Sequence, residues 1–363
     1  MSIIHWIGID DHADKWTIAH LKGSSADLEK SFELVPSEPG YRKLISYLKG
    51  LSGEIRIVYE AGPCGYELYR RLRKAKLECA VAAPSLTPRK PGERIKTNRR
   101  DAVKLARYLR SGDLTLIAVP DRDRESLRDL TRGREAVQKA VVSIRNQIGK
   151  MLLRYGHRYR EGNAWTQKYW TWLGKVKLEG WSQAVLLEML ATHEQRCAQL
   201  ARYDGLIEEA AQREEYAPFL EALRVLRGIN TLSAMTILAE LGDLRRFASA
   251  PQLMAAIGLV PSEYSTGETT SRFSITKTGN SHVRRILVEA AWQYRRISRG
   301  RTITARRRGR PQALLDIATR CDLRLNRKFH RMTSRGKRST VTAVALAREL
   351  AGFIWALGQV KPA

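Results

Sequence analysis

The sequence predicts an α/β plus α fold, in which a mixed α/β region precedes a longer and mainly helical region. The first 120 residues alternate short β-rich runs with runs of helical spacing, whereas the long periodic stretches after residue 120 are helical. The chain has 363 residues, which is more than one ordinary domain needs and favours two or three domains. Hydrophobic residues make up 43% of the chain, enough to bury a core and to argue against a wholly disordered basic tail.

The elements of the first region follow a definite order. Short strands are expected at residues 3–10 and 15–21 around a polar turn, which is a hairpin signal, with a third strand at 31–35. The elements expected next are a helix at 40–49, a strand at 54–59, a helix at 65–74, a strand at 78–83 and a helix at 98–110. Residues 84–97 are rich in Pro, Gly and Lys and predict a loop. This order is that of a ribonuclease H-like α/β domain.

The second region divides into an arm and a terminal block. Two long helical stretches at 123–155 and 183–212 flank a Trp-rich patch and predict an antiparallel coiled-coil arm. From residue 218 the chain resembles a helix-hairpin-helix, whose glycine turn can hold a phosphate through backbone N–H groups. An ordinary helical hairpin explains the same pattern equally well. The expected domains are therefore 1–120, 121–217 and 218–363, and residues 341–360 predict a buried amphipathic helix rather than a membrane span.

The positive charge of the chain is concentrated in two blocks. The formal net charge is +27, of which residues 89–110 carry +7 and residues 270–340 carry +17. Charge gathered in this way favours a nucleic-acid partner, with an anionic membrane surface as the alternative. The four cysteines are scattered, which argues against a zinc site or a disulfide framework and favours reduced thiols in a cytoplasmic protein. A secreted scaffold and a small-metabolite enzyme are both disfavoured.

Acidic residues of the first region form the first candidate site. Asp10 and Glu60 end two expected strands, and Asp101 lies near the start of an expected helix. Carboxylates placed in this way can converge on Mg²⁺, and a pair of such ions supports phosphodiester cleavage. Asn98 lies one helical turn before Asp101 and is either a neutral metal ligand or the N-cap of that helix. Each acid taken alone is more commonly a solvated strand end or helix cap.

Hydroxyl groups beside basic residues form the second candidate site. Ser265 and Thr266 lie in an expected glycine-punctuated loop, near Lys277, Arg284 and Arg285. Such a hydroxyl can attack a phosphodiester while the cations support the developing charge, but a loop that only contacts phosphate explains the pattern too. The Arg-rich tract that follows, which includes Arg306, Arg307 and Arg308, is expected to bind backbone phosphates without reading sequence. Lys96, Arg99 and Arg100 are expected to hold a nucleic-acid strand beside Asp101.

A series of motifs in fixed order resembles the insertion-sequence transposases of the one-ten and eleven-eleven type, which are DEDD recombinases related to the Piv invertase. The motifs are Gly8-Ile9-Asp10, Tyr59-Glu60-Ala61-Gly62-Pro63, Lys96-Thr97-Asn98-Arg99-Arg100-Asp101-Ala102, Leu226-Arg227-Gly228-Ile229, Leu259-Val260-Pro261-Ser262-Glu263-Tyr264, Ile275-Thr276-Lys277-Thr278-Gly279-Asn280, Leu287-Val288-Glu289-Ala290-Ala291-Trp292 and Ala347-Arg348-Glu349-Leu350-Ala351-Gly352-Phe353-Ile354-Trp355. The resemblance therefore covers essentially the whole chain.

The resemblance implies a RuvC-like N-terminal domain, a coiled-coil arm and a C-terminal transposase domain. It also implies Mg²⁺ bound by four acids, a serine nucleophile linked transiently to DNA, and dimers or tetramers guided by an element-encoded RNA on the bacterial nucleoid. Asp10, Glu60 and Asp101 match three acidic positions, while Asn98 stands where the family has Asp. Thr266 stands where the family has its nucleophilic serine, directly after Ser265.

These two departures leave three hypotheses open. The first is an Mg²⁺-dependent DNA transposase and recombinase in which Thr266 or Ser265 is the nucleophile. The second is a catalytically degenerate homologue that binds nucleic acid without cutting it. The third is a structure-specific DNA nuclease that uses only the first domain.

Overall fold

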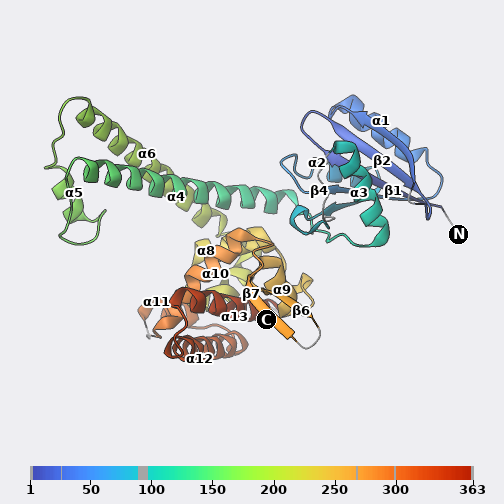
Figure 1. The fold of residues 1–363 in the computed structure, drawn as a ribbon. Helices are drawn as coiled ribbons and strands as arrows, with labels where there is room; N and C mark the ends of the chain where they lie inside the picture. The colour runs from blue at the N-terminus through green and yellow to red at the C-terminus, as the bar shows by residue number, and fades with distance from the viewer. Residues whose placement is uncertain (1–2, 26, 89–96, 267–268, 298–299, 361–363) are drawn as a thin grey trace. The chain divides into compact units, whose positions relative to one another are not determined.

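A computed structural model describes residues 3–25, 27–88, 97–266, 269–297 and 300–360. The chain forms two compact units, Met1–Pro120 and Asp121–Ala363, and each is described here by itself. The first unit is a mixed α/β structure and the second is mainly helical, so the expected order of an α/β region followed by an α region is confirmed (Figure 1).

The first unit is built on a five-stranded sheet. Its elements are β1 (Ile4–Asp11), β2 (Trp16–Lys22), β3 (Leu28–Leu34), α1 (Glu38–Lys49), β4 (Glu54–Glu60), α2 (Glu67–Lys74), β5 (Glu78–Ala82), a short 3₁₀ helix η1 (Pro84–Leu86) and α3 (Asn98–Ser111). The strand order is β3-β2-β1-β4-β5. β1, β2 and β3 form an antiparallel meander, whereas β4 and β5 run parallel to β1. The carboxyl ends of β1 and β4 therefore lie side by side.

The two faces of this sheet are covered by different helices. Odd-numbered residues of β1, such as Ile7 and Ile9, pack with Leu44 of α1 and Leu72 of α2 in one buried cluster. The opposite face packs against α3, because residue alternation along a strand sends even-numbered side chains there. Gly8 lies on that face, where a Cβ atom would overlap the carbonyl oxygen of Ala102. The glycine therefore allows α3 to lie directly on β1.

Among its described residues the second unit contains ten α-helices, three short 3₁₀ helices and one β-hairpin. Its elements are α4 (Arg122–Arg154), α5 (Gln167–Leu173), α6 (Trp181–Ala210), η2 (Glu214–Tyr216), α7 (Ala217–Arg224), α8 (Thr231–Leu241), η3 (Leu244–Arg246), α9 (Ala250–Ile257), β6 (Pro261–Thr266), β7 (Thr269–Ile275), α10 (Ser281–Ala291), η4 (Trp292–Arg295), α11 (Arg301–Arg307), α12 (Gln312–Ser334) and α13 (Ser339–Gly358).

The long helices α4 and α6 pack against each other in antiparallel directions (Figure 1). Arg134 Nε donates a hydrogen bond to Asp204 Oδ1 at 2.8 Å, whereas further along α4 the Tyr155 hydroxyl lies 2.5 Å from Ser182 Oγ. Residue numbers thus rise along α4 as they fall along α6. The aromatic residues around α5 close the end of this pair, which we call the arm.

The remaining helices surround one large core. α13 contributes Leu346, Leu350 and Ile354 to it, and it packs against α9, α10 and α12. Among the described residues α13 is also the one helix long and apolar enough to cross a membrane by length and composition. Its buried side chains belong to the protein core, as the apolar pattern at 341–360 predicts.

The expected loop around Ser265 and Thr266 is wrong, because both residues lie in strand β6 of a β6–β7 hairpin. Ser and Thr beside Pro261 and Gly267 resemble a loop, and only Phe273, Ser274 and Ile275 alternate apolar with polar residues. Thr266 pairs with Thr269, so it lies at the last ladder position before residues 267–268, which are outside the described part.

Candidate active site

Asp10 and Glu60 occupy neighbouring positions at the carboxyl ends of two adjacent strands, β1 and β4. The parallel register pairs Ile9 with Tyr59, so Asp10 and Glu60 are the next residues of β1 and β4. Tyr59 packs in the cluster on the α1 and α2 side, and Val58 packs with Leu105 of α3 on the other. Strand alternation therefore places both acids on the face covered by α3, where each is half-buried.

The first turn of α3 supplies the other two predicted ligands. Ala102 and Leu105 are buried against the sheet, and Asn98 and Asp101 lie half-buried on the same side of the helix, one turn nearer its start. Thr97 is the N-cap of α3, since its hydroxyl accepts a hydrogen bond from Arg100 N at 3.3 Å. The alternative role of Asn98 as the N-cap is therefore wrong, which leaves its amide for another function.

Oxygen donors of this kind suit a hard cation such as Mg²⁺. Three carboxylates and one amide come from β1, β4 and α3 at the same face of the first unit. Within the part of the chain that the structure describes, however, no three His, Cys, Asp or Glu side chains are gathered closely enough to hold a metal ion. The oxygen donors and the face that they share suit Mg²⁺. Their side chains, however, are not close enough together to form a complete binding site.

Two neighbours of Asp10 were not singled out as part of a site by the sequence. His12 is exposed, and its Nε2 lies 3.3 Å from Asp10 Oδ2. Asp11 faces the opposite side of the sheet, where Trp16 Nε1 donates a hydrogen bond to Asp11 Oδ1 at 2.7 Å. Burial raises the pKa of Asp11 despite this hydrogen bond. Alternation along β1 thus separates Asp10 from Asp11 and gives them different surroundings.

The hairpin with Ser265 and Thr266 is held at its base. Lys277 N donates to Gly258 O at 3.2 Å, and Arg284 Nη1 donates to Ile257 O at 2.7 Å. Asn280 caps α10, and its Nδ2 donates to Glu240 Oε2 at 2.6 Å. Lys277 has a φ of 57°, an uncommon conformation for a residue other than glycine. The base is therefore fixed, while the strand end with Thr266 is exposed.

The predicted phosphate-binding cations separate into two groups. Arg99, Arg100, Lys277 and Arg308 are exposed, and no side-chain ion pair is found for them among the described residues. The others have partners inside the protein. Arg306 Nη1 donates to Ile229 O at 3.0 Å, and Arg307 Nε donates to Val225 O at 2.9 Å. Lys96 lies outside the described residues.

The internal partners give these arginines a structural role that the sequence did not predict. Arg307 also forms an ion pair of 3.0 Å with the buried Asp322. Burial lowers the pKa of the Arg306 and Arg284 guanidinium groups, so their charge is partly shielded from water. The carbonyl groups that follow α7 are thereby satisfied by side chains. The tract that resembled a uniform phosphate-binding surface thus also holds the fold together.

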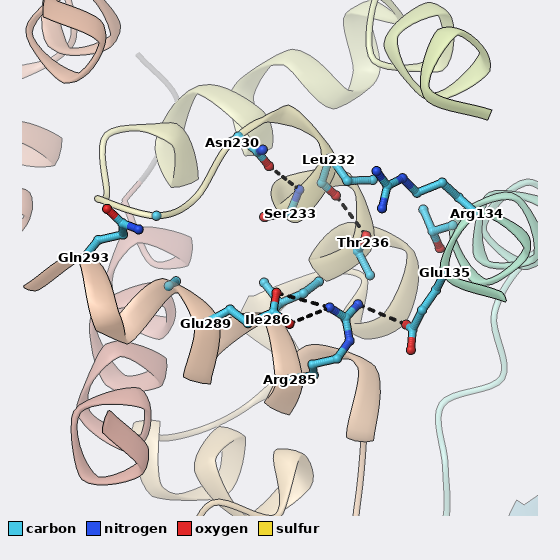
Figure 2. A pocket seen from close by; sticks show the side chains of 13 residues that line it. Arg134, Glu135, Asn230, Leu232, Ser233, Thr236, Arg285, Ile286, Glu289 and Gln293 are labelled. Carbon is cyan, nitrogen blue, oxygen red and sulfur yellow. Dashed lines mark hydrogen bonds and ion pairs between the residues drawn. The ribbon is translucent and has the colours of Figure 1, made fainter. Parts of the chain in front are cut away.

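A glycine turn joins α7 to α8, and this turn and α8 border a pocket of about 270 Å³ (Figure 2). α7 ends at Arg224, Gly228 has a φ of 75°, and Asn230 caps α8 by accepting a hydrogen bond from Ser233 N at 2.8 Å. Figure 2 shows Arg285 pointing between two carboxylates of the pocket wall. Its guanidinium donates to Glu289 at 3.0 Å and to Glu135 at 3.1 Å. A phosphate in this pocket has to compete with these carboxylates for Arg285.

Comparisons with known proteins find sequence models of transposases and relatives that are named as transposases. Residues 7–157 match a sequence model of DEDD transposases of the IS110 group, and residues 220–306 match the model described as "Transposase IS116/IS110/IS902 family". A protein of Sinorhizobium fredii that is named as a transposase is 41% identical over 98% of this chain and 88% of its own length. The transposase for insertion sequence element IS1533 of Leptospira borgpetersenii is 32% identical over 92% of this chain and 98% of its own length.

A more distant relative is the transposase for insertion sequence element IS1111A of Coxiella burnetii, which is 24% identical over 54% of each chain. The match over residues 7–157, which span most of the α/β unit and the whole of α4, places the chain in the class of DEDD transposases. The chain belongs to the IS116/IS110/IS902 family of transposases. Its family is one of DNA-acting enzymes of insertion sequences, and the resemblance noted in the sequence is confirmed.

Proposed function

We propose that the chain is an Mg²⁺-dependent recombinase that cleaves and rejoins DNA strands at the ends of its own insertion sequence. One observation carries the proposal. In a chain of this family, Asp10 and Glu60 lie at adjacent strand ends, on the face where the first turn of α3 presents Asn98 and Asp101. The strand order β3-β2-β1-β4-β5, with α3 across β1, supports a ribonuclease H-like (RuvC-like) assignment of the first unit.

Each group has a defined role in this proposal. Asp10, Glu60 and Asp101 would hold Mg²⁺ with their carboxylates, and Asn98 would add a neutral amide oxygen. When bound, Mg²⁺ would supply positive charge to the developing negative charge of the reaction. Arg99 and Arg100 are exposed beside Asp101 and bind the phosphates of the strand to be cut.

The nucleophile is a hydroxyl of β6. Thr266 is exposed at the end of the strand, and Ser265 precedes it. The attacking hydroxyl oxygen, of Thr266 or Ser265, forms a bond to phosphorus while the bond from phosphorus to one DNA oxygen breaks. The hydroxyl proton passes to that leaving oxygen. The terminal hydroxyl of another DNA strand then attacks the same phosphorus. This step rejoins the DNA and restores the free hydroxyl of the enzyme. One phosphodiester is exchanged for another at each step, so no external energy source is needed.

The assembly follows from the same resemblance. The proposal divides the chain into a RuvC-like domain at 1–120, a coiled-coil arm at 121–217 and a transposase domain at 218–363. It includes DNA ends and target as substrates, an element-encoded guide RNA, and a homodimer or tetramer acting on the nucleoid in the cytoplasm. Exposed Lys277, at the base of the hairpin, and exposed Arg308, directly after α11, would contact DNA phosphates.

Strand cleavage with cognate element ends, guide RNA and Mg²⁺ tests the proposal. A covalent protein–DNA adduct is expected on a denaturing gel, and Asp10→Ala should abolish it. The absence of an adduct, together with Asp10→Ala activity equal to that of the unmodified protein, would contradict the proposal. A nuclease that uses only the first unit would still cut after Ser265→Ala and Thr266→Ala are combined.

A second candidate is a degenerate homologue that binds nucleic acid without cutting. Asn98 and Thr266 favour it, because one metal-binding charge is lost and threonine is a more crowded nucleophile than serine. Asn98→Asp combined with Thr266→Ser separates the two candidates. Cleavage should rise if the ancestral site is otherwise intact, whereas the degenerate homologue predicts salt-sensitive binding and no cleavage even after both changes.

A further inference from the structure

The end of the arm has a composition unlike the rest of α4 and α6. We define the arm tip as residues 150–181, which comprise the end of α4, α5 and the first residue of α6. This segment contains four of the eight tryptophans of the chain and three tyrosines. None of these aromatic residues belongs to either candidate catalytic site. They therefore need a separate explanation.

Part of this aromatic group forms a small core. Tyr169 and Leu173 are buried, and Tyr169 contacts Trp165 with ring centroids 5.0 Å apart. Trp165 stacks on His193 of α6 at 4.8 Å, and the Arg145 guanidinium lies 5.1 Å from the centre of the Trp165 ring. These contacts hold α5 against the two long helices. The inner aromatic residues therefore give the tip a rigid framework.

Other rings of the tip face solvent. The Trp181 side chain is 89% exposed, and Tyr155 is 45% exposed. Tyr155 bonds through its hydroxyl to Ser182, the residue after Trp181, at 2.5 Å, so Tyr155 lies against the first turn of α6, which begins at Trp181. The Arg154 guanidinium lies 5.5 Å from the centre of the Tyr155 ring. A fully exposed tryptophan gains nothing from the protein core, and such side chains commonly mark binding surfaces.

The tip is also strongly basic. Residues 150–181 contain seven Lys or Arg and two Glu, a net charge of +5 outside the two basic blocks noted in the sequence. The seven cations are Lys150, Arg154, Arg158, Arg160, Lys168, Lys175 and Lys177, and each is exposed. The structure describes this whole segment, and no carboxylate lies within ion-pair distance of any of the seven. Their charge is directed at solvent.

We propose that the arm tip binds an unpaired nucleic-acid strand, with bases stacked on Trp181 and Tyr155 and phosphates held by the surrounding lysines and arginines. Exposed aromatic rings beside unpaired cations are the features with which proteins bind single strands, because every base offers a face for stacking. Most of the tip lies between the matched regions 7–157 and 220–306, so the family models do not account for it. The site is separate from the proposed catalytic groups.

Charge argues against a second copy of the tip as the occupant. Two surfaces of net charge +5 repel each other, and the chain as a whole carries +27. A polyanion gains from the same charge through release of its counterions. Duplex DNA has phosphates for the lysines and arginines of the tip to bind. Its bases are stacked on each other, however, so they are not available to stack on Trp181 and Tyr155. An unpaired strand uses both features of the tip.

Fluorescence anisotropy of the full-length protein with labelled oligouridine, oligothymidine and duplex DNA tests this site. Trp181→Ala should weaken binding of the unpaired strands about fivefold or more, and change duplex binding by less than about twofold. Lys175→Glu with Lys177→Glu should weaken binding and reduce its salt dependence. If Trp181→Ala weakens binding of oligouridine alone, the bound strand is RNA. If it weakens binding of both oligouridine and oligothymidine, the site does not distinguish the two sugars. Either result supports the site.

Two matched controls lie on the same helix, farther along α6. Leu206→Ala removes an exposed apolar side chain, and Arg196→Glu reverses an exposed charge about 22 Å from Trp181. Both should bind all three probes as the unmodified protein does. Iodouridine placed in the strand should cross-link under light to Trp181 or Tyr155, as identified by mass spectrometry.

Equal binding of unpaired strands by Trp181→Ala and Leu206→Ala, without a cross-link to the tip, would overturn the proposal. A lower assembly mass for Trp181→Ala in sedimentation, with strand binding unchanged, would also overturn it and identify the tip as a protein interface. Because Trp181 is exposed, its replacement should leave the circular dichroism spectrum and the Tm unchanged.

Discussion

Carboxylates serve two different purposes in the two units of this molecule. At the sheet edge of the first unit, Asp10, Glu60 and Asp101 are half-buried oxygen donors, and no ion pair of Glu60 or Asp101 is found among the described residues. In the second unit the carboxylate of Glu240 has no exposed surface and lies 2.7 Å from Arg132 Nε. Asp322 is likewise buried between two arginines.

The difference teaches which acids are available to a ligand. A buried carboxylate needs a matching charge and hydrogen bonds within the protein, because water no longer solvates it. Burial acts to raise the pKa of Glu240, but hydrogen bonds from Arg132 and Asn280 outweigh it and lower the pKa overall. The acids at the sheet edge keep access to solvent, so a cation from solution can complete their surroundings.

Removing a sheet-edge acid should have the largest effect, and it should act on activity rather than on stability. Asp10→Asn keeps the size of the side chain and removes its charge, so cleavage should fall about a hundredfold or more. The Tm should change less than for a fully buried acid, because the Asp10 side chain keeps access to solvent and its neighbour His12 is exposed. Strand-cleavage rates and thermal unfolding measure the two effects. A large fall in Tm with full cleavage activity would reverse the assignment of this acid.

Removing a buried acid of the second unit should lower the stability of the fold rather than act directly on cleavage. Glu240→Ala removes the buried carboxylate to which Arg132 and Asn280 donate hydrogen bonds, so the free energy of unfolding should fall by about 3–5 kcal/mol. Glu240→Gln keeps hydrogen-bonding atoms in place and should cost less. Urea-induced unfolding measures both values. If Glu240→Ala is as stable as the unmodified protein, the ion pair contributes nothing to the fold.

Gly8→Ala tests how α3 is placed on the sheet. The added Cβ overlaps the carbonyl oxygen of Ala102, so α3 has to move away from β1. We expect a loss of about 1–3 kcal/mol in unfolding free energy. Cleavage should fall as well, because Asp101 moves relative to Asp10. Gly149→Ala in α4 is the matched control, since its Cβ meets open space and should be neutral or stabilising.

The smallest effect is expected for Glu135, whose partners are partly exposed. Burial acts to raise its pKa, but hydrogen bonds from His282, Lys139 and Arg285 outweigh this and lower the pKa to about 2. A lowered pKa stabilises the folded state above the ordinary value of 4.5, and this contribution is lost as the pH falls toward 2. Solvent screening limits it to about 1 kcal/mol at neutral pH.

Glu135→Gln should therefore flatten the dependence of unfolding free energy on pH between 4.5 and about 2. The difference from the unmodified protein should be present at neutral pH and disappear near pH 2. Urea unfolding across this range measures the slope. An unchanged slope would show that other carboxylates, such as Glu349, account for the acid sensitivity.

Much of the first unit could be predicted because its signals are local. Strand and helix runs follow their apolar periodicity, and β1, β4 and α3 begin and end within a few residues of the expected bounds. The positions of Asp10 and Glu60 at strand ends follow from those bounds. Their place beside each other does not, because it depends on the pairing of β1 with β4 across 42 intervening residues.

The second unit was harder to predict because its decisive contacts are distant in sequence. The β6–β7 hairpin was taken for a loop, since its strands are short and rich in Ser and Thr. Arg306 and Arg307 were expected to bind phosphate, and they also bind carbonyl groups near Gly228. Nothing in an Arg-rich tract indicates which guanidinium groups have partners in the fold.

The sequence by itself determined the order of elements in the first unit, the two basic blocks and the family to which the chain belongs. These features depend on residue type and spacing along the chain, which periodicity and motifs report directly. The tertiary structure alone decided that Asp10 and Glu60 share a face with Asp101, that Thr97 rather than Asn98 caps α3, and which charged groups neutralise one another. Charges and packing act through space, so their outcome is set only when distant segments meet.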